Sequence, residues 1–454
     1  MAHLPTCLGV KKRLLIPPIS PEGAVFLTRT LYTEPQGGGL LQVFGDLTAS
    51  DTFGEYFARR SADHGATWSE PSPVFLPERL PEGTVRLGES ALLRDDALHR
   101  IFRFYNHSVY PEAETFSMSV MRRMRIEYEV STDEGVSFSQ PKPLIVEGGD
   151  ATQWAPRTVY GRNSLAISFC CPLVDRRGRI LLPARWVPEI TPETTLIVPM
   201  QVVCLIGETD AVGALRWSAG DFVTVDEECS VRGLCEPALI ECADGRLLMV
   251  CRGSNAGRPD MPGRKWFTTS SDGGKTWAPV RPWSYDTGEF FFSPATGSNL
   301  LRSSRNGKIY WIGNIVPENP TGNLPRFPLC IGEVDEESLA LRKDTARIIE
   351  SRLPTDTPKV QLSNFHTYED RATGELVIIL PRLFENSESS LRSPAYEYRV
   401  SVPVRERGHL ARSDCKNAGA TPTLPSFDSL AERVCEECVD VSSAGLWSIS
   451  YQTT

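Results

Sequence analysis

Short apolar segments, each followed by a turn rich in Gly, Pro or Asp, recur along residues 20–404. In the stretch GLCEPALIECADGRLLMVCRGS, for example, two such segments flank a turn at Ala243, Asp244 and Gly245. Gly and Pro interrupt helices and favour tight turns, whereas apolar segments of this length suit β-strands. The pattern therefore predicts an all-β chain of many short strands rather than a helical bundle.

Three of the turns share the pattern S-x-D-x-G-x-[TS]-[WF]. They begin at Ser61, Ser131 and Ser270 and read SADHGATW, STDEGVSF and SSDGGKTW. The Asp carboxylate can accept hydrogen bonds from turn amides, the Gly can adopt a positive φ, and the aromatic side chain can pack beneath the turn. Each segment is therefore expected to be a structural hairpin corner, and its carboxylate is not a catalytic candidate.

The three turns follow a common period. The first two serines lie 70 residues apart, and the second and third lie 139 apart, which is close to two periods. Degenerate copies are therefore expected near Asp210, with Trp217 behind it, and near Asp335, and a sixth strand is expected over 396–402. Six units of about 65–70 residues predict a six-bladed β-propeller of four-stranded antiparallel blades.

The sequence divides into three predicted segments. Residues 1–19 form an N-terminal extension, residues 20–404 form the propeller, and residues 405–454 form a polar tail that is expected to be partly disordered. Within the tail, 426–438 is a candidate short helix, and the strand-like segment 446–451 could return to close the ring.

The net charge of the chain argues against one class of function. The chain has 48 Lys and Arg against 57 Asp and Glu, a net charge of −9, which argues against a general nucleic-acid binder. A few arginines can still form a local positive pocket in an acidic protein. No segment is long and apolar enough for a membrane span, and the apolar part after residues 11–13 is too short for a signal peptide. A cytoplasmic protein is expected.

Cysteine spacing indicates neither a disulfide framework nor a metal site. Most of the 12 cysteines lie in apolar segments, where buried free thiols are expected. Cys435 and Cys438 form an isolated CxxC without a second pair or a histidine, which is a weak basis for zinc binding. No metal or organic cofactor is predicted.

The repeated turn is the Asp-box, and with six blades the chain resembles the sialidase (neuraminidase) superfamily over roughly residues 20–404. The resemblance implies an exo-acting glycoside hydrolase that releases terminal sialic acid or a related acidic sugar with retention. It also implies three arginines from different blades that hold the sugar carboxylate through bidentate bonds. The matching positions are Arg29, Arg252 and Arg326, and Arg302 and Arg305 are alternatives for the third.

The resemblance further implies an aspartate that acts as acid and base, and a glutamate that serves as base for the nucleophile. Asp51 matches the aspartate, and Asp46 and Glu55 are nearby alternatives. Glu236 matches the glutamate. It precedes Arg252 by 16 residues across one predicted hairpin, so both side chains can reach the same rim. A structural salt bridge between them is the alternative interpretation.

The implied nucleophile, a tyrosine, is ambiguous in this chain. Residue separation selects Tyr368, which precedes Glu385 by 17 residues. Counting back from the turn at 372–374 selects Ser363 or Asn364 instead, and a slip of one residue reverses the faces of a strand. Tyr368 is the only tyrosine within reach and is the predicted nucleophile, with His366 as an alternative polar group and a buried structural role as the competing interpretation.

Two other functions remain open. One is a propeller enzyme that hydrolyses or eliminates at another acidic sugar, such as a uronate, and the other is a non-catalytic glycan-binding propeller. The predicted partner is a sialylated or other acidic glycan substrate. Convergence of Arg29, Arg252 and Arg326 at one end of the central channel would favour the two enzymes.

Overall fold

A computed structural model describes residues 4–7, 9–111, 115–191, 194 and 198–404. The features predicted in the tail, namely the helix over 426–438, the strand over 446–451 and the pair Cys435 and Cys438, lie outside the described residues. Within the described ranges, no helix combines the length and apolarity that crossing a membrane requires.

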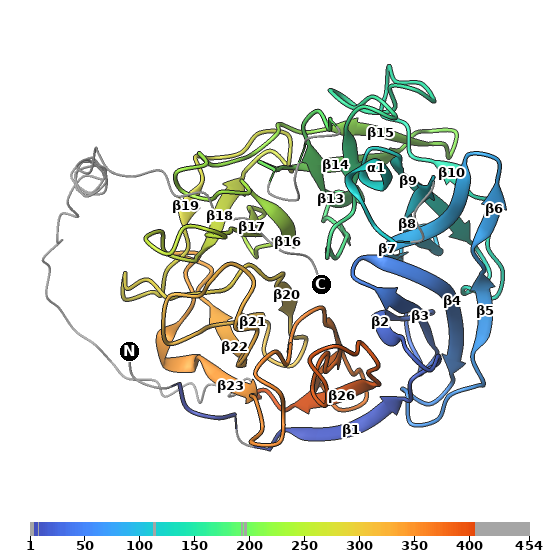
Figure 1. The fold of residues 1–454 in the computed structure, drawn as a ribbon. Helices are drawn as coiled ribbons and strands as arrows, with labels where there is room; N and C mark the ends of the chain where they lie inside the picture. Colours follow the sequence, from blue (N-terminus) through green and yellow to red (C-terminus); the bar gives the residue numbers. More distant parts are fainter. Residues whose placement is uncertain (1–3, 8, 112–114, 192–193, 195–197, 405–454) are drawn as a thin grey trace, which may run out of the picture. The chain divides into compact units, whose positions relative to one another are not determined.

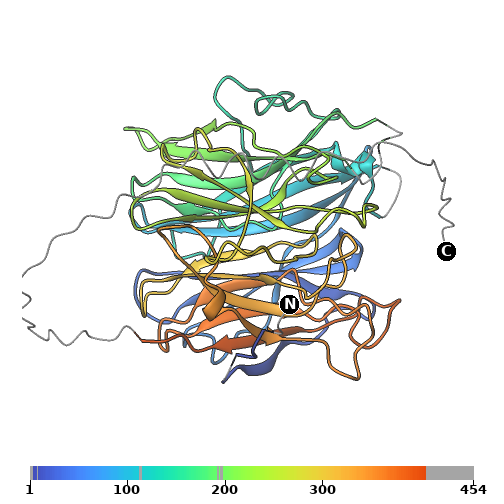
Figure 2. The same cartoon turned by 90° about the vertical axis from the view of Figure 1, so that its left-hand side faces the viewer.

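Six antiparallel sheets surround a centre as the blades of a propeller (Figure 1). Seen from the side, the strands run between the two faces of the ring (Figure 2). The first three blades contain, in chain order, blade 1 with β2 (Ala24–Tyr32), β3 (Leu40–Ala49), β4 (Thr52–Ser61) and β5 (Ser72–Phe75); blade 2 with β6 (Glu78–Leu80), β7 (Gly83–Asp95), β8 (Arg100–Tyr110), β9 (Met124–Ser131) and β10 (Lys142–Pro143); and blade 3 with β11 (Ser164–Ala166), β12 (Leu173–Val174), β13 (Ile180–Val187), β14 (Gln201–Thr209) and β15 (Leu215–Ala219).

The strands of the other three blades are given from the centre outward, and two short helices lie between strands in the described ranges. The elements are blade 4 with β16 (Cys235–Glu241), β17 (Leu247–Arg252), β18 (Lys265–Ser270) and β19 (Arg281–Pro282); blade 5 with β20 (Asn299–Arg302), β21 (Ile309–Asn314), β22 (Leu329–Val334) and β23 (Arg347–Glu350); blade 6 with β24 (His366–Glu369), β25 (Leu376–Pro381), β26 (Ala395–Val400) and β1 (Lys11–Ile16); and the helices α1 (Met118–Met121) and η1 (Lys343–Thr345).

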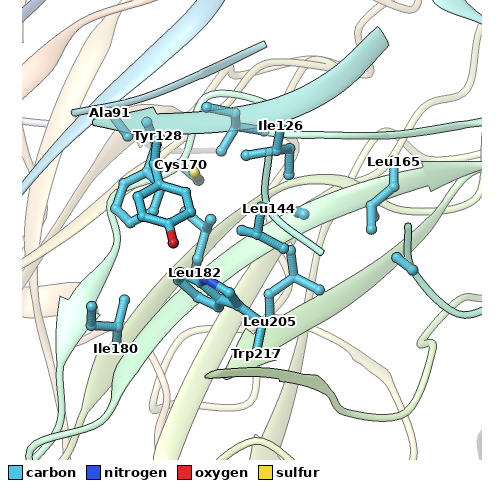
Figure 3. Packing of buried hydrophobic residues seen from close by; sticks show 14 of the residues in the cluster. Ala91, Ile126, Tyr128, Leu144, Leu165, Cys170, Ile180, Leu182, Leu205 and Trp217 are labelled. Atoms are coloured by element: carbon cyan, nitrogen blue, oxygen red, sulfur yellow. The ribbon is translucent and has the colours of Figure 1, made fainter. Parts of the chain in front are cut away.

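A separate hydrophobic cluster fills each interface between neighbouring blades. Alternate residues of a strand face opposite sides of its sheet, so the middle strands supply two clusters at once. In β3, Leu41 and Val43 pack toward blade 2, whereas Leu40 and Phe44 pack toward blade 6. Figure 3 shows the cluster between blades 2 and 3, in which Trp217 packs on apolar side chains of both. Burial on both faces explains the nearly continuous apolar segments of the sequence.

The three predicted hairpin corners join the last two strands of blades 1, 2 and 4. In the first, Asp63 accepts hydrogen bonds from the Thr67 amide at 2.8 Å and the Thr67 hydroxyl at 2.6 Å, and Gly65 has φ +82°. The Nε1 of Trp68 donates to the Gly65 carbonyl oxygen, so the ring lies beneath the turn as expected. The degenerate copies occupy the same corners of blades 3 and 5, where Asp210 and Asp335 accept amide hydrogen bonds.

The ring is closed by β1, which forms the outer strand of blade 6. Its residues pair with β26 in antiparallel register, for example Arg13 with Glu397. Arg13 also donates from Nε to the Glu397 carboxylate at 2.8 Å, and Glu397 is only 1% exposed. Because β26 would otherwise leave an open sheet edge, this N-terminal strand belongs to the propeller, although it lies within the segment 1–19 that the sequence pattern placed outside it.

Candidate active site

A cavity of about 370 Å³, here called the central cavity, is lined by residues from all six blades. The inner strands of the blades surround the middle of the ring (Figure 1), which places the cavity in the central channel. Its lining combines charged and apolar side chains. The lining includes, from blades 1 to 6 in order, Leu27, Glu89, Arg185, Glu236, Arg326 and Asn364.

Several inner strands bulge where they reach this cavity. Leu27, Phe169, Glu236 and Asn364 all line the cavity and all have positive φ values, between 45° and 58°. This conformation is unfavourable for residues with a side chain, by about 1–2 kcal/mol each. The strand register shifts at two of these residues, Leu27 in β2 and Glu236 in β16. Bulges re-aim side chains, and clustered backbone strain of this kind is typical of functional sites.

Glu236 and Arg252 form an ion pair in the cavity wall. Arg252 donates from Nη1 to the Glu236 carboxylate and from Nη2 to Asn323 Oδ1 at 2.9 Å. Burial alone would lower the pKa of Arg252, but the charge of Glu236 outweighs it and raises the pKa. Lys265 is fully buried beside this pair, donates to the Thr296 carbonyl oxygen, and has its pKa lowered to about 7 by burial.

Arg326 lies in the same wall, in the segment between β21 and β22. Its Nη1 donates to Gln361 Oε1 at 3.0 Å and to Ser363 Oγ at 3.3 Å, so neutral groups hold it. Burial, together with the charge of Arg252, lowers its pKa to about 10. The alternatives Arg302 and Arg305 do not line the cavity, because Arg302 pairs with Glu336 and Arg305 donates to a carbonyl oxygen.

Two further arginines line the cavity, Arg185 from β13 and Arg232 from the segment before β16. Within the described residues neither forms a salt bridge, and Arg185 donates from Nη1 to the Met121 sulfur at 3.8 Å. Burial and the charge of Arg252 lower the pKa of Arg232. Buried guanidinium groups without a carboxylate partner are unfavourable unless an anion joins them. The wall is therefore suited to an anionic ligand.

Glu89 is a carboxylate that the sequence analysis missed. It lies in the bulge of β7, and its Oε2 accepts a hydrogen bond from the Phe169 amide. Burial, with a contribution from the charge of Glu236, raises the pKa of Glu89 to about 7. A proton donor with a pKa near neutrality suits general acid catalysis. The one signal in the sequence was the polar group Gly88-Glu-Ser90 between the apolar residues Leu87 and Ala91.

Asp51 lies at the exposed rim of the central cavity, in the turn between β3 and β4. It has φ +52°, and the Tyr110 hydroxyl donates to its backbone oxygen at 3.0 Å. The alternatives Asp46 and Glu55 do not line the cavity. The structure thus brings together four of the six predicted residues: Asp51, Glu236, Arg252 and Arg326.

Arg29 does not line the central cavity. The bulge in β2 places Leu27 in the wall, and Arg29 lies beyond it with Nε donating to the Ser90 carbonyl oxygen at 2.8 Å. The sequence spacing could not show this bulge.

Tyr368 is also outside the cavity, in the hydrophobic cluster between blades 6 and 1, where its ring packs against Tyr32. Burial raises the pKa of Tyr368, and its hydroxyl has no hydrogen-bond partner among the described residues. The positions found by counting back from the turn at 372–374 lie closer to the site than Tyr368 does. Asn364 lines the cavity, and Ser363 accepts a hydrogen bond from Arg326. In the described part of the chain, no tyrosine lines the cavity.

The sequence matches the BNR repeat-like domain family over residues 55–342. No curated protein matches it. Among solved structures, a protein of unknown function from Dyadobacter fermentans aligns with 87% of this chain and 100% of its own, at 16% identity and a TM-score of 0.58.

Two sialidases are similar in structure. The Trypanosoma rangeli sialidase in complex with the inhibitor DANA aligns with 87% of this chain at 12% identity and a TM-score of 0.57. The NanB sialidase of Streptococcus pneumoniae aligns with 85% of this chain and 70% of its own, at 13% identity and a TM-score of 0.55. The chain spans only 60% of the length of the trypanosomal sialidase. At such low identities, these similarities establish a shared six-bladed fold.

Proposed function

Because the chain belongs to the BNR repeat-like domain family, we propose that its central cavity binds the terminal carboxylated sugar of a glycan and hydrolyses the glycosidic bond. The observation that carries this proposal is the set of arginines in the cavity wall. Arg185, Arg232 and Arg326 form no salt bridge within the described residues, and they surround a space that also holds carboxylates. Planar guanidinium groups bind a carboxylate through paired, charge-assisted hydrogen bonds.

The carboxylates can supply the acid and the base of the reaction. Glu89 is the favoured proton donor, because a pKa of about 7 leaves a large fraction protonated at neutral pH, and Asp51 at the rim is the alternative. The donor protonates the glycosidic oxygen while water attacks the anomeric carbon. This single displacement inverts the anomeric configuration, in contrast to the retention expected from the resemblance, because no tyrosine lines the described part of the cavity. Glu236, oriented by Arg252, accepts the proton of that water. The products are the free acidic sugar and the remaining glycan.

Hydrolysis of 4-methylumbelliferyl glycosides tests this proposal. We expect fluorescence from the sialoside or the glucuronide and none from the galactoside, which lacks a carboxylate. Arg326→Gln should lower kcat/KM by about 10- to 100-fold, because a charge-assisted contact with the substrate is lost. Arg216→Gln, which changes an exposed arginine on the outer strand β15, should leave kcat/KM unchanged.

A non-catalytic glycan-binding role is the second candidate, and the lack of a tyrosine among the described lining residues favours it. This role predicts that free sialic acid or glucuronic acid binds to the protein, measured by calorimetry, and that no glycoside is hydrolysed. Arg326→Gln would then weaken binding. If neither acidic sugar binds and neither acidic glycoside is hydrolysed, both candidates fail.

A further inference from the structure

A second cavity, of about 260 Å³, lies further along the same channel and is here called the distal cavity. Its lining residues follow those of the central cavity on the same inner strands. Arg29 comes two residues after Leu27, and Leu239 comes three residues after Glu236. Since a strand advances by about 3.3 Å per residue, the two cavities are offset by roughly 7–10 Å along the strands.

The walls of the distal cavity are mainly apolar and contain two charged residues, Arg29 and Arg302. Within the part of the chain that the structure describes, no carboxylate lines it. Arg302 is already paired, because Nη1 and Nη2 donate to the Glu336 carboxylate at 2.7 and 2.8 Å. Arg29 is therefore the charged residue of this lining that is available to bind a ligand. The apolar walls are formed by Ala91, Leu92, Leu173, Leu239, Leu300 and Leu301.

Arg29 is only 2% exposed and lacks an anionic partner. Its Nε donates to a backbone oxygen, its Nη2 has no hydrogen-bond partner, and it forms no salt bridge within the described residues. Glu89, which lines the central cavity, interacts with Arg29 through its charge but forms no hydrogen bond with it among the described residues. The ring of Phe169, 5.7 Å from the guanidinium carbon, adds a weak cation–π contact. An anion in the distal cavity would satisfy this buried charge.

His366 adds a polar group to the distal cavity without adding charge. Its Nε2 lies 2.9 Å from the Thr30 carbonyl oxygen, which can only accept, so Nε2 carries the ring proton. Burial and the charge of Arg29 lower the pKa of His366 to about 3, so the ring is neutral at physiological pH. A single cation, Arg29, therefore remains unpaired, and it matches a ligand with a single negative charge.

We propose that the distal cavity binds a small monocarboxylate with a short aliphatic chain. The carboxylate pairs with Arg29, and the chain packs on the surrounding leucines. A water molecule occupies about 30 Å³ in the liquid, so the volume corresponds to roughly eight or nine water-sized groups. Butanoate and hexanoate, with six and eight non-hydrogen atoms, fit this volume, acetate leaves the apolar walls uncovered, and octanoate, with ten, exceeds it.

Calorimetric titration of the full chain with a series of acids tests the proposal. We expect butanoate or hexanoate to bind about 10-fold more tightly than acetate, because each added methylene is buried against leucine side chains. Octanoate should bind more weakly than hexanoate, and butylammonium should not bind. The proposal is overturned if none of the acids gives saturable binding, or if butylammonium binds as well as butanoate.

Variants distinguish the distal cavity from the central cavity. Arg29→Met should weaken butanoate binding by about 10- to 100-fold, whereas Arg326→Gln should not change it. The opposite pattern would place the acid in the central cavity and overturn the proposal. If Arg29→Met does not fold, Leu92→Phe decides, because it enlarges a half-buried lining residue, narrows the distal cavity, keeps Arg29 and should also weaken binding. This test does not depend on glycoside hydrolysis, so the two proposals can fail separately.

Discussion

At the residue scale, environment rather than residue type separates the carboxylates of the central cavity. Glu89 is half-buried beside Glu236, so its pKa is raised to about 7, whereas Glu236 is held by Arg252. Asp51 lies at the exposed rim. The family resemblance selected Asp51 and Glu236 in the sequence, but it did not point to Glu89, because the role of Glu89 depends on a bulge in β7 and on burial by other blades.

Glu89→Gln tests the assigned proton donor. Removing a general acid should lower kcat by about 10²- to 10⁴-fold on the acidic glycoside that the wild type hydrolyses. Wild-type activity should fall as the pH rises through about 7, because the donor must be protonated. The control is Glu55→Gln, which changes an exposed carboxylate outside the cavity. An unchanged kcat in Glu89→Gln would exclude this residue as the donor.

The same residue should also affect stability. Its pKa rises from 4.5 to about 7 on folding, so the folded state holds the proton more tightly. Stability is therefore lost as the pH rises from 4.5 through 7, and Glu89→Gln should remove this loss. We expect thermal or urea unfolding at pH 8 to show the variant more stable than the wild type by about 1–3 kcal/mol, with little difference at pH 4. A variant that is less stable at pH 8 would contradict the expectation.

Tyr368→Phe tests whether the predicted nucleophile has a catalytic role. The hydroxyl is buried in the cluster between blades 6 and 1, without a hydrogen-bond partner among the described residues. Its removal should leave glycoside hydrolysis within about 2-fold of the wild type and should not lower stability, because no hydrogen bond is lost. The activity of Tyr368→Phe is compared with that of Asn364→Ala, which changes a side chain that does line the central cavity. A large loss of activity in Tyr368→Phe alone would restore the tyrosine as nucleophile.

At the element scale, the hairpin corners repeat one set of hydrogen bonds. In the second corner, the Asp133 carboxylate accepts from the Ser131 hydroxyl, the Ser137 amide and the Ser137 hydroxyl. The hydrogen bond from the Ser137 hydroxyl is the largest cause that lowers the pKa of Asp133 to about 2. The three clear corners were predictable because all of these contacts are local in sequence.

Asp133→Ala should destabilise the corner of blade 2. The turn amides and hydroxyls lose their shared acceptor, and we expect the melting temperature at pH 7 to fall by about 2–6 °C. Glu134→Ala is the matched control, since its side chain is exposed and the contact recorded for it uses the backbone oxygen. The difference in melting temperature between the wild type and Asp133→Ala should shrink below pH 3.8. Between pH 3.8 and about 2 the wild-type carboxylate becomes protonated and progressively loses its contribution to stability. Equal melting temperatures for both variants at pH 7 would refute the role of Asp133.

At the scale of the whole molecule, the two ends of the described ring meet in blade 6. The strand β1 covers the edge of β26, and Arg13 reaches both Glu397 and the Gly65 carbonyl oxygen of blade 1. One strand from the start of the chain therefore joins the last blade to the first. Local patterns could not show this contact, because the paired residues are 384 positions apart in the sequence.

Removal of residues 1–16 should open the ring. The variant leaves β26 unpaired and Glu397 without Arg13, and we expect a melting temperature lower by about 10 °C or more, together with concentration-dependent association through the exposed edge. Melting curves and light scattering measure the two effects. Lys11→Ala is the control within β1, because this side chain is 72% exposed and its salt bridge lies at the surface. A truncated chain that melts like the wild type would show that β1 is dispensable.

The sequence by itself determined the propeller, since its signals are local: the turn chemistry of the Asp-boxes, their period, and apolar strands buried on both faces. It also selected the hairpin that carries Glu236 and Arg252, because their spacing is set by a single turn. Only the tertiary structure decided which other side chains meet them. Bulges in β2 and β7 place Leu27 and Glu89 in the central cavity, and Arg29 beyond it. A bulge changes the direction of a side chain without changing the hydrophobic pattern, so no count along the sequence could reveal it.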